Sequence, residues 1–362
     1  MLRLATLLLA CLLVAGFSSW PGLAASLAAH LVTPDGASPL LPQARLEAAY
    51  ARLPHRSGYV TTTSGVALFW RALDPGDYRM DYAWTRPPGE GAPLDVHLDF
   101  QPPVATGAAT RGTVVLLHGW MMDGGSLLPW SLALAQAGYR TITLDLRNHG
   151  RSGAAPSGYG TREAADVVDA VAALRASGEV VGPLSLFGVS YGAATALFAA
   201  ADPSLAAHRV VALASFDNAG GAIRAMVPHM LADDTGDWQT RLTRHWLRWR
   251  IDAATLDTAI AQAGARLDLP LDEVDVGAAL ARVPGCVLLV HGRADQHVPV
   301  AQGRALAAAA PRARYLELAG EDHLSLPMRL DLLLPTVVDW FDAPACPANA
   351  RPANARTARA RV

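Results

Sequence analysis

The sequence predicts an α/β fold with a mostly parallel central sheet that helices cover on both faces. Short, continuously apolar runs alternate with helical segments between residues 113 and 341, and such runs are typical of parallel strands buried on both sides. The chain has 362 residues, of which 51% are hydrophobic, so it can bury a large core. Parallel sheets bind ligands beyond the carboxyl ends of their strands, and residues directly after these runs are therefore the site candidates.

The first 110 residues precede this alternation. Residues 1–25 carry a positive charge at Arg3, followed by the apolar run 4–17. Small residues at Ala25 and Ala28 are candidate cleavage positions, and the whole pattern is typical of a cleaved export signal. We therefore expect an exported protein, periplasmic or secreted, or one that an uncleaved N-terminal segment anchors in a membrane. Membrane contact is expected only through that segment.

Residues 26–110 are expected to form helical segments followed by antiparallel strands. The stretch up to about residue 56 is rich in Ala and Leu, and Pro34, Pro39 and Pro42 interrupt it. Alternating apolar and polar residues then predict strands at 57–63, 66–70, 78–84 and 94–100.

Two core regions, residues 111–216 and 283–343, carry the parallel strands and their helices. Strands are predicted at residues 113–117, 141–144, 184–187, 210–214, 287–290 and 314–318. Helices are predicted near residues 127–137, 161–177, 300–310 and 326–341, with a further helix directly after Ser190.

The segment between the two core regions is too long for an ordinary connection. Roughly seventy residues separate the strands at 210–214 and 287–290, whereas a median connection has about 4 to 6. Residues 217–282 are predicted to form a helical cap over the site, with one helix at 237–251. Residues 344–362 are rich in Pro, Ala and Arg and are expected to be disordered.

Composition excludes several classes of function. The net charge is −2, so nothing indicates a nucleic-acid partner. All 30 basic residues are arginine, which excludes a Ser–Lys dyad, a lysine Schiff base and a lysine-dependent phosphate loop. The three cysteines, Cys11, Cys286 and Cys346, show no zinc-site spacing, and no metal or other cofactor is expected. Whether Cys286 and Cys346 pair stays open.

The segment Gly188-Val189-Ser190-Tyr191-Gly192 is the most informative stretch of the chain. It follows an apolar strand and precedes an Ala-rich helix, which indicates a sharp strand-to-helix turn. Such a turn lifts its central side chain clear of the sheet and places it at a helix N-terminus. Ser190 is therefore the candidate nucleophile.

Three further groups follow predicted strands and complete a catalytic set. His323 follows the strand at 314–318 and suits the role of general base near neutral pH. Asp295 follows the strand at 287–290 and is the candidate that orients His323. The backbone amides of Trp120 and Tyr191 are the candidate oxyanion hole.

Other residues near these positions offer weaker alternatives. His118 and the turn at Asp145 and Arg147 are expected to be structural. His149 is a rival base, and Glu321 and Asp322 are adjacent rivals for the acid, although neighbours in one loop seldom face the same ring.

The chain order Ser190, Asp295, His323 resembles that of the α/β-hydrolase superfamily, and the resemblance spans about residues 113–341. Within that superfamily the chain is similar to serine hydrolases such as esterases, lysophospholipases and aminopeptidases of the S33 type. The resemblance implies an α/β-hydrolase fold, a small acyl substrate, a Ser-His-Asp triad and no cofactor. Asn148 departs from the glycine that many relatives carry in that loop.

The expected activity is hydrolysis of a carboxylic ester through an acyl-enzyme. A peptidase with the same triad is the alternative, and its free-amine subsite would need an acid such as Asp233, Asp234 or Glu321. A non-enzymatic binding protein on the same fold is a further alternative, which predicts that Ser190 does not react with a fluorophosphonate.

Overall fold

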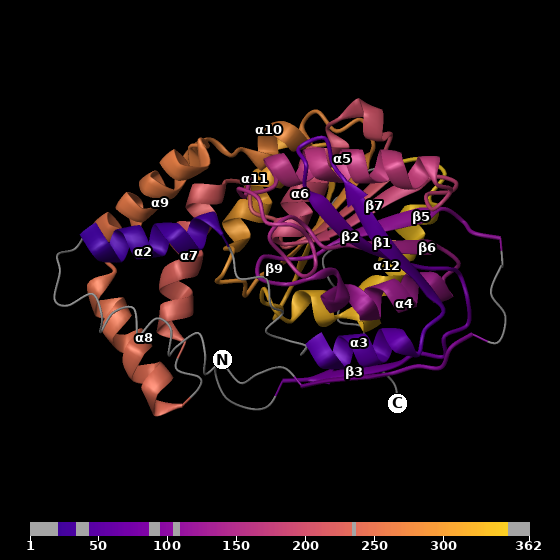
Figure 1. Ribbon diagram of the computed structural model, residues 1–362, viewed down its shortest axis with the longest axis horizontal. Helices are drawn as coiled ribbons and strands as arrows, with labels where there is room; N and C mark the ends of the chain where they lie inside the picture. The colour runs from indigo at the N-terminus through magenta and orange to yellow at the C-terminus, as the bar shows by residue number, and fades with distance from the viewer. Residues whose placement is uncertain (1–20, 34–42, 87–94, 104–108, 234–236, 347–362) are drawn as a thin grey trace.

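The computed structural model describes residues 21–33, 43–86, 95–103, 109–233 and 237–346. A central sheet lies between helices, and a group of helices extends from one end of the molecule (Figure 1). The sheet has eight strands in the order β1-β2-β6-β5-β7-β8-β9-β10. Their bounds are β1 (His55–Thr61), β2 (Ala67–Leu73), β5 (Thr113–Leu117), β6 (Arg140–Leu144), β7 (Leu184–Val189), β8 (Arg209–Leu213), β9 (Cys286–Gly292) and β10 (Arg314–Leu318).

Strands β6, β5, β7, β8, β9 and β10 run parallel, and this confirms the predicted fold class. Each of the six begins and ends within two residues of its predicted bounds. Registers such as Leu117 with Gly188 and Val189 with Leu213 bring the carboxyl ends of neighbouring strands to one edge. Residues that are far apart in the sequence therefore meet beyond that edge.

The four predicted antiparallel strands divide between two sheets. The first two become β1 and β2, and β2 pairs antiparallel with β6 at the side of the main sheet. The other two become β3 (Asp81–Thr85) and β4 (Asp95–Asp99), which pair with each other in a separate two-stranded sheet.

Helices cover both faces of the main sheet, as predicted. One apolar core contains side chains of α4 (Leu128–Gln136) and α12 (Leu330–Asp342). The core on the other face contains side chains of α5, α6, α10 and α11. Their bounds are α5 (Thr161–Ala176), α6 (Tyr191–Ala200), α10 (Val276–Leu280) and α11 (Val300–Ala309). A further helix, α3 (Gln43–Ala51), places Leu46 and Tyr50 in buried positions.

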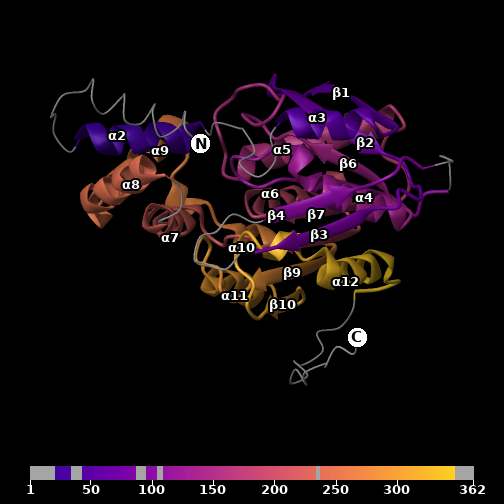
Figure 2. The same ribbon diagram turned by 90° about the horizontal axis from the view of Figure 1, so that it is seen from below.

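The insertion between β8 and β9 begins with α7 (Ala219–Ala232), α8 (Trp238–Arg250) and α9 (Ala253–Leu267). With the short α10, these helices make up the predicted cap segment. Figures 1 and 2 both show α7, α8 and α9 at one end of the molecule, together with the N-terminal helix α2 (Pro21–Val32).

Helix α2 packs against α9 through buried side chains of Ala24, Ala28 and Leu31. It begins at Pro21, inside the predicted export signal, and runs through both predicted cleavage positions. A cut after Ala25 or Ala28 would remove the first part of this packed helix. None of the described helices is both long and apolar enough to cross a membrane. The apolar run 4–17 lies outside the described residues.

A disulfide joins Cys286, at the start of β9, to Cys346 beyond the last helix, with a Cα–Cα distance of 5.4 Å. This answers the open question of whether the two cysteines pair. The bond ties the first residues of the predicted tail to the central sheet. Residues 347–362 of that tail lie outside the described residues.

Candidate active site

The turn at Ser190 has the strained geometry that the sequence predicts. Ser190 lies between β7 and α6 with φ 54° and ψ −114°, a backbone conformation that residues other than glycine rarely adopt. A methyl group at Gly192 would overlap the carbonyl of Leu117, and one at Gly188 would overlap the backbone of Gly192. The two glycines therefore allow α6 to pack directly against the ends of β5 and β7.

Ser190, His323 and Asp295 form a continuous hydrogen-bonded chain. The Nε2 of His323 lies 2.9 Å from Oγ of Ser190, and its Nδ1 lies 2.7 Å from Oδ2 of Asp295. With the proton on Nδ1, His323 donates to Asp295 and accepts from the serine hydroxyl. The structure thus brings together three residues that are separated by as many as 133 positions.

Asp295 is buried and held from two sides. Its Oδ1 accepts a hydrogen bond from the Val298 amide at 2.8 Å, and its Oδ2 lies 3.4 Å from Nε2 of His291. Burial alone would raise the pKa of Asp295, but hydrogen bonds from His291 and His323 outweigh burial and hold this pKa well below its usual range. The carboxylate is therefore ionised beside His323 at neutral pH.

The two amides assigned to the oxyanion hole follow neighbouring strands, β5 and β7. Neither the Trp120 nor the Tyr191 amide donates a hydrogen bond to another described residue. Gly119 packs close to Ser190, since a Cβ at position 119 would lie 3.7 Å from the Cβ of Ser190. The Tyr191 amide is thus adjacent to Ser190 in the sequence, and the Trp120 amide follows a glycine that packs against Ser190. Both N–H groups are available to a substrate oxygen.

The family model described as the alpha/beta hydrolase family matches residues 114–331. The chain belongs to this family. The match covers the strands from β5 to β10, except the first residue of β5, together with Ser190, Asp295 and His323. Membership supports a hydrolase activity on the fold described above.

Individual relatives of this hydrolase are distant. The uncharacterized protein YqkD of Bacillus subtilis (strain 168) is 26% identical over 235 residues, which cover 64% of this chain and 72% of YqkD. The esterase Pf2001 of Pyrococcus furiosus has a TM-score of 0.56 and 17% identity, covering 86% of this chain and 98% of its own. The esterase EaEST of Exiguobacterium antarcticum has a TM-score of 0.52 and 17% identity, covering 79% and 99%. These two structures show a shared fold.

His118 has the structural role expected of it. Its ring is fully buried, with Nδ1 2.8 Å from the carbonyl of Gly119 and Nε2 accepting from the Leu146 amide at 3.0 Å. Burial lowers the pKa of His118 to about 4, so the ring is neutral and ties the β5 loop to the β6 loop.

The rival residues lie elsewhere. His149 is buried against the ring of His118, and its Nδ1 bonds to the carbonyl of Arg147, whereas the Ser190 hydroxyl bonds to His323. The Glu321 carboxylate forms an ion pair with Arg329. Asp322 accepts from the Ser325 amide and pairs with Arg86. The structure therefore places Asp295, and neither of its rivals, against His323.

Sequence reasoning missed His297, which lies beside His323, and His229, which contacts His297. The ring of His297 stacks on that of His323 with centroids 5.3 Å apart, and His229 of α7 meets His297 edge-on at 4.4 Å. Burial, followed by the charges of His323 and His229, lowers the pKa of His297 to about 4. His297 lies two positions after Asp295, which was the available signal, whereas nothing in the apolar α7 segment marks His229. Through His229, α7 contacts His297 next to the ring of His323.

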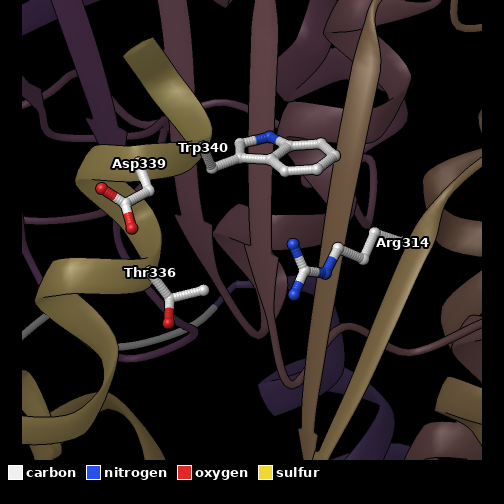
Figure 3. Close-up of a pocket in the computed structure, with 4 residues that line it drawn as sticks. All are labelled: Arg314, Thr336, Asp339 and Trp340. Atoms are coloured by element: carbon white, nitrogen blue, oxygen red, sulfur yellow. The ribbon is translucent and has the colours of Figure 1, made fainter. Parts of the chain in front are cut away.

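A pocket of about 150 Å³ lies between β10 and α12, lined by Arg314, Thr336, Asp339 and Trp340 (Figure 3). Arg314 is the first residue of β10, so this pocket opens at the amino ends of the strands. Ser190, Asp295 and His323 follow the carboxyl ends. This pocket is therefore separate from the hydrolase site.

Asp145, expected to be structural, accepts the amides of Gly124 and Arg151 and lies beside a second buried acid, Asp123. Burial and then the charge of Asp145 raise the pKa of Asp123 to about 6, against about 3.9 in an unfolded chain. The folded state therefore binds the Asp123 proton more tightly than the unfolded state does. The contribution of this proton to the free energy of unfolding is lost as the pH rises from about 4 to about 6.

We expect Asp123→Asn to remove this loss. The free energy of unfolding of the variant minus that of the wild type should increase by about 2 kcal/mol when the pH is raised from 4 to 7. Urea unfolding followed at several pH values measures the difference, and the exposed Asp77→Asn serves as the control. A difference that stays constant over this pH range would contradict the expectation.

Proposed function

We propose that this hydrolase cleaves carboxylic esters through an acyl-enzyme formed on Ser190, with Ser190, His323 and Asp295 as its catalytic triad. The observation that carries the proposal is the chain of two hydrogen bonds, 2.9 Å from Ser190 to His323 and 2.7 Å from His323 to Asp295. A serine hydroxyl is a weak nucleophile until a positioned base takes its proton, and this chain supplies the base and the group that orients it.

In the proposed reaction, Oγ of Ser190 attacks the ester carbonyl carbon while Nε2 of His323 takes the hydroxyl proton. The carbonyl oxygen becomes an oxyanion that the Trp120 and Tyr191 amides bind, and Asp295 stabilises the imidazolium. His323 then returns the proton to the leaving alcohol. A water molecule that His323 deprotonates attacks the acyl-enzyme in the same way and releases the acid.

The acyl substrate is proposed to be a small molecule bound between the sheet edge and α7. Met226 and Met230 lie in α7 and offer contacts for an apolar acyl or alkyl group. Met226 is only partly exposed and remains a candidate for such contact. Trp238 and Trp249 of α8 are 65% and 75% exposed, and they therefore do not line a closed acyl pocket.

A panel of acyl esters, acyl amides and aminoacyl anilides tests the reaction class. We expect turnover of esters with short to medium apolar acyl groups and little turnover of the anilides. Turnover of amides alone would favour a peptidase. The acids considered for an amine subsite do not support that alternative, because Asp233 pairs with Arg244 and Glu321 pairs with Arg329, while Asp234 lies outside the described residues.

Labelling by a fluorophosphonate separates an enzyme from a binding protein on the same fold. Such a probe forms a covalent bond only with an activated serine. We expect labelling at Ser190, located by peptide mass analysis, and no covalent adduct would overturn the proposed mechanism.

A further inference from the structure

The outer face of α8 carries an exposed stripe of large apolar side chains. Trp238, Leu242, Trp246 and Trp249 are 65%, 61%, 37% and 75% exposed. These four are half of the eight large hydrophobic side chains that are exposed in the described part of the chain, and one helix of 13 residues holds them. An apolar surface gathered in this way marks an interaction site rather than the usual scatter.

The spacing of these side chains places them on one side of the helix. Each residue of an α-helix advances by about 100°, so the four positions fall within about 80° of one another. Leu247 lies on the opposite side and is buried. The helix thus turns one apolar residue toward the protein and its tryptophans toward the solvent.

Positive charge borders the stripe. Residues 238–250 contain four arginines and no acidic residue, although the whole chain has a net charge of −2. Arg241 and Arg248 are exposed along one border of the stripe. On the other border, the Arg250 guanidinium lies over the rings of Trp246 and Trp249, at 5.4 Å and 5.6 Å from their centroids. A partner for this face is therefore apolar at its centre and anionic around it.

From this face we propose that α8 docks on a membrane surface that contains anionic lipids. Tryptophan is enriched at the boundary between headgroups and acyl chains, and helices that lie in this boundary combine an apolar face with flanking Arg or Lys. The amphipathic indoles enter the boundary while the arginines bind lipid phosphates.

The place of α8 in the fold agrees with this orientation. Figures 1 and 2 show α8 at the same end of the molecule as α2 and α9. Helix α2 is fixed to α9 by its buried side chains and by a hydrogen bond from Arg266 to the Ala25 carbonyl. Three residues separate the start of α2 from the apolar run 4–17. The chain that carries the membrane-directed segment therefore enters the fold at the same end as the α8 stripe.

The test uses the full chain with vesicles of phosphatidylcholine alone and of phosphatidylcholine mixed equally with phosphatidylglycerol. The N-terminal segment could hold every variant on a vesicle, so the deciding readout is quenching of tryptophan fluorescence by lipids brominated along the acyl chains. We expect quenching on the mixed vesicles, and Trp238→Phe/Trp249→Phe should lose most of the quenchable emission. Equal quenching in the variant and the wild type would overturn the proposal.

Charge is tested with Arg241→Gln/Arg248→Gln, which should weaken binding to the mixed vesicles about tenfold and leave binding to neutral vesicles unchanged. The matched control, Tyr59→Ser/Leu332→Ser, removes exposed apolar side chains from the body of the protein and should bind like the wild type. Equal binding of the arginine variant and the wild type to mixed vesicles would overturn the proposal.

Sedimentation velocity without vesicles tests whether a second copy of the chain, rather than a membrane, covers this face. Self-association of the wild type that Trp238→Ser/Leu242→Ser/Trp249→Ser abolishes would show that a second copy covers this face, and would also overturn the proposal. A monomeric wild type is the expected result. Unchanged circular dichroism and unchanged hydrolysis of a soluble ester establish that each variant is folded.

Discussion

Ser190→Ala is expected to lower kcat for ester hydrolysis by at least about 10⁴-fold, the largest effect of any single substitution proposed for this protein. Alanine leaves His323 with no hydroxyl to deprotonate, so no acyl-enzyme forms. The turn itself should persist, because Gly188 and Gly192 carry its close backbone contacts and alanine only removes Oγ. Initial rates on the best ester of the panel, together with fluorophosphonate labelling, measure the loss.

Ser215 provides a matched control for this substitution. It is a buried serine shortly after β8, the strand next to β7, and its hydroxyl donates to the carbonyl of Phe216 rather than to a histidine. Ser215→Ala is expected to keep the wild-type kcat. If Ser190→Ala kept it as well, another residue would be the nucleophile and the proposed reaction would be wrong.

The sheet and the positions of Ser190, Asp295 and His323 after its strands could be predicted because both depend on local patterns. The runs at β5, β7 and β9 are largely apolar because both faces of those strands are buried, and Trp120, Ser190 and Asp295 follow them. His323 follows β10, a half-buried strand at the edge of the same sheet. Parallel pairing then brings the ends of the strands to one edge, whatever the lengths of the connections. Ser190 and His323 therefore meet although 133 positions separate them.

Contacts between separate elements could not be predicted in this way. The sequence around Ala24 and Ala28 predicts a helix but does not show whether that helix is exposed or, as in α2, packed on α9. His229 lies beside His297 because of the path that α7 takes between β8 and β9. The Cys286–Cys346 bond depends on where the chain after α12 returns, which no nearby residue specifies. Such contacts follow from tertiary packing of distant segments rather than from local preference.

Asp295→Asn is expected to lower kcat by about 10³- to 10⁴-fold while the protein stays folded. The asparagine carbonyl oxygen can still accept the Val298 amide, so the side-chain NH₂ group then faces Nδ1 of His323. By donating to Nδ1, it holds the ring proton on Nε2, the nitrogen that must accept from Ser190. The variant also lacks the negative charge that stabilises the imidazolium.

Separate measurements of kcat and KM, together with a control variant at the neighbouring acid Glu321, distinguish an orienting role of Asp295 from a structural one. The loss is expected in kcat and in the rate of fluorophosphonate labelling, whereas KM should change little, because the Val298 amide still holds the side-chain oxygen of residue 295. Glu321→Gln, in the loop next to His323 but paired with Arg329, should keep the wild-type kcat. A large loss of kcat in Glu321→Gln together with a small loss in Asp295→Asn would contradict the proposal. Glu321, rather than Asp295, would then be the acid that orients His323.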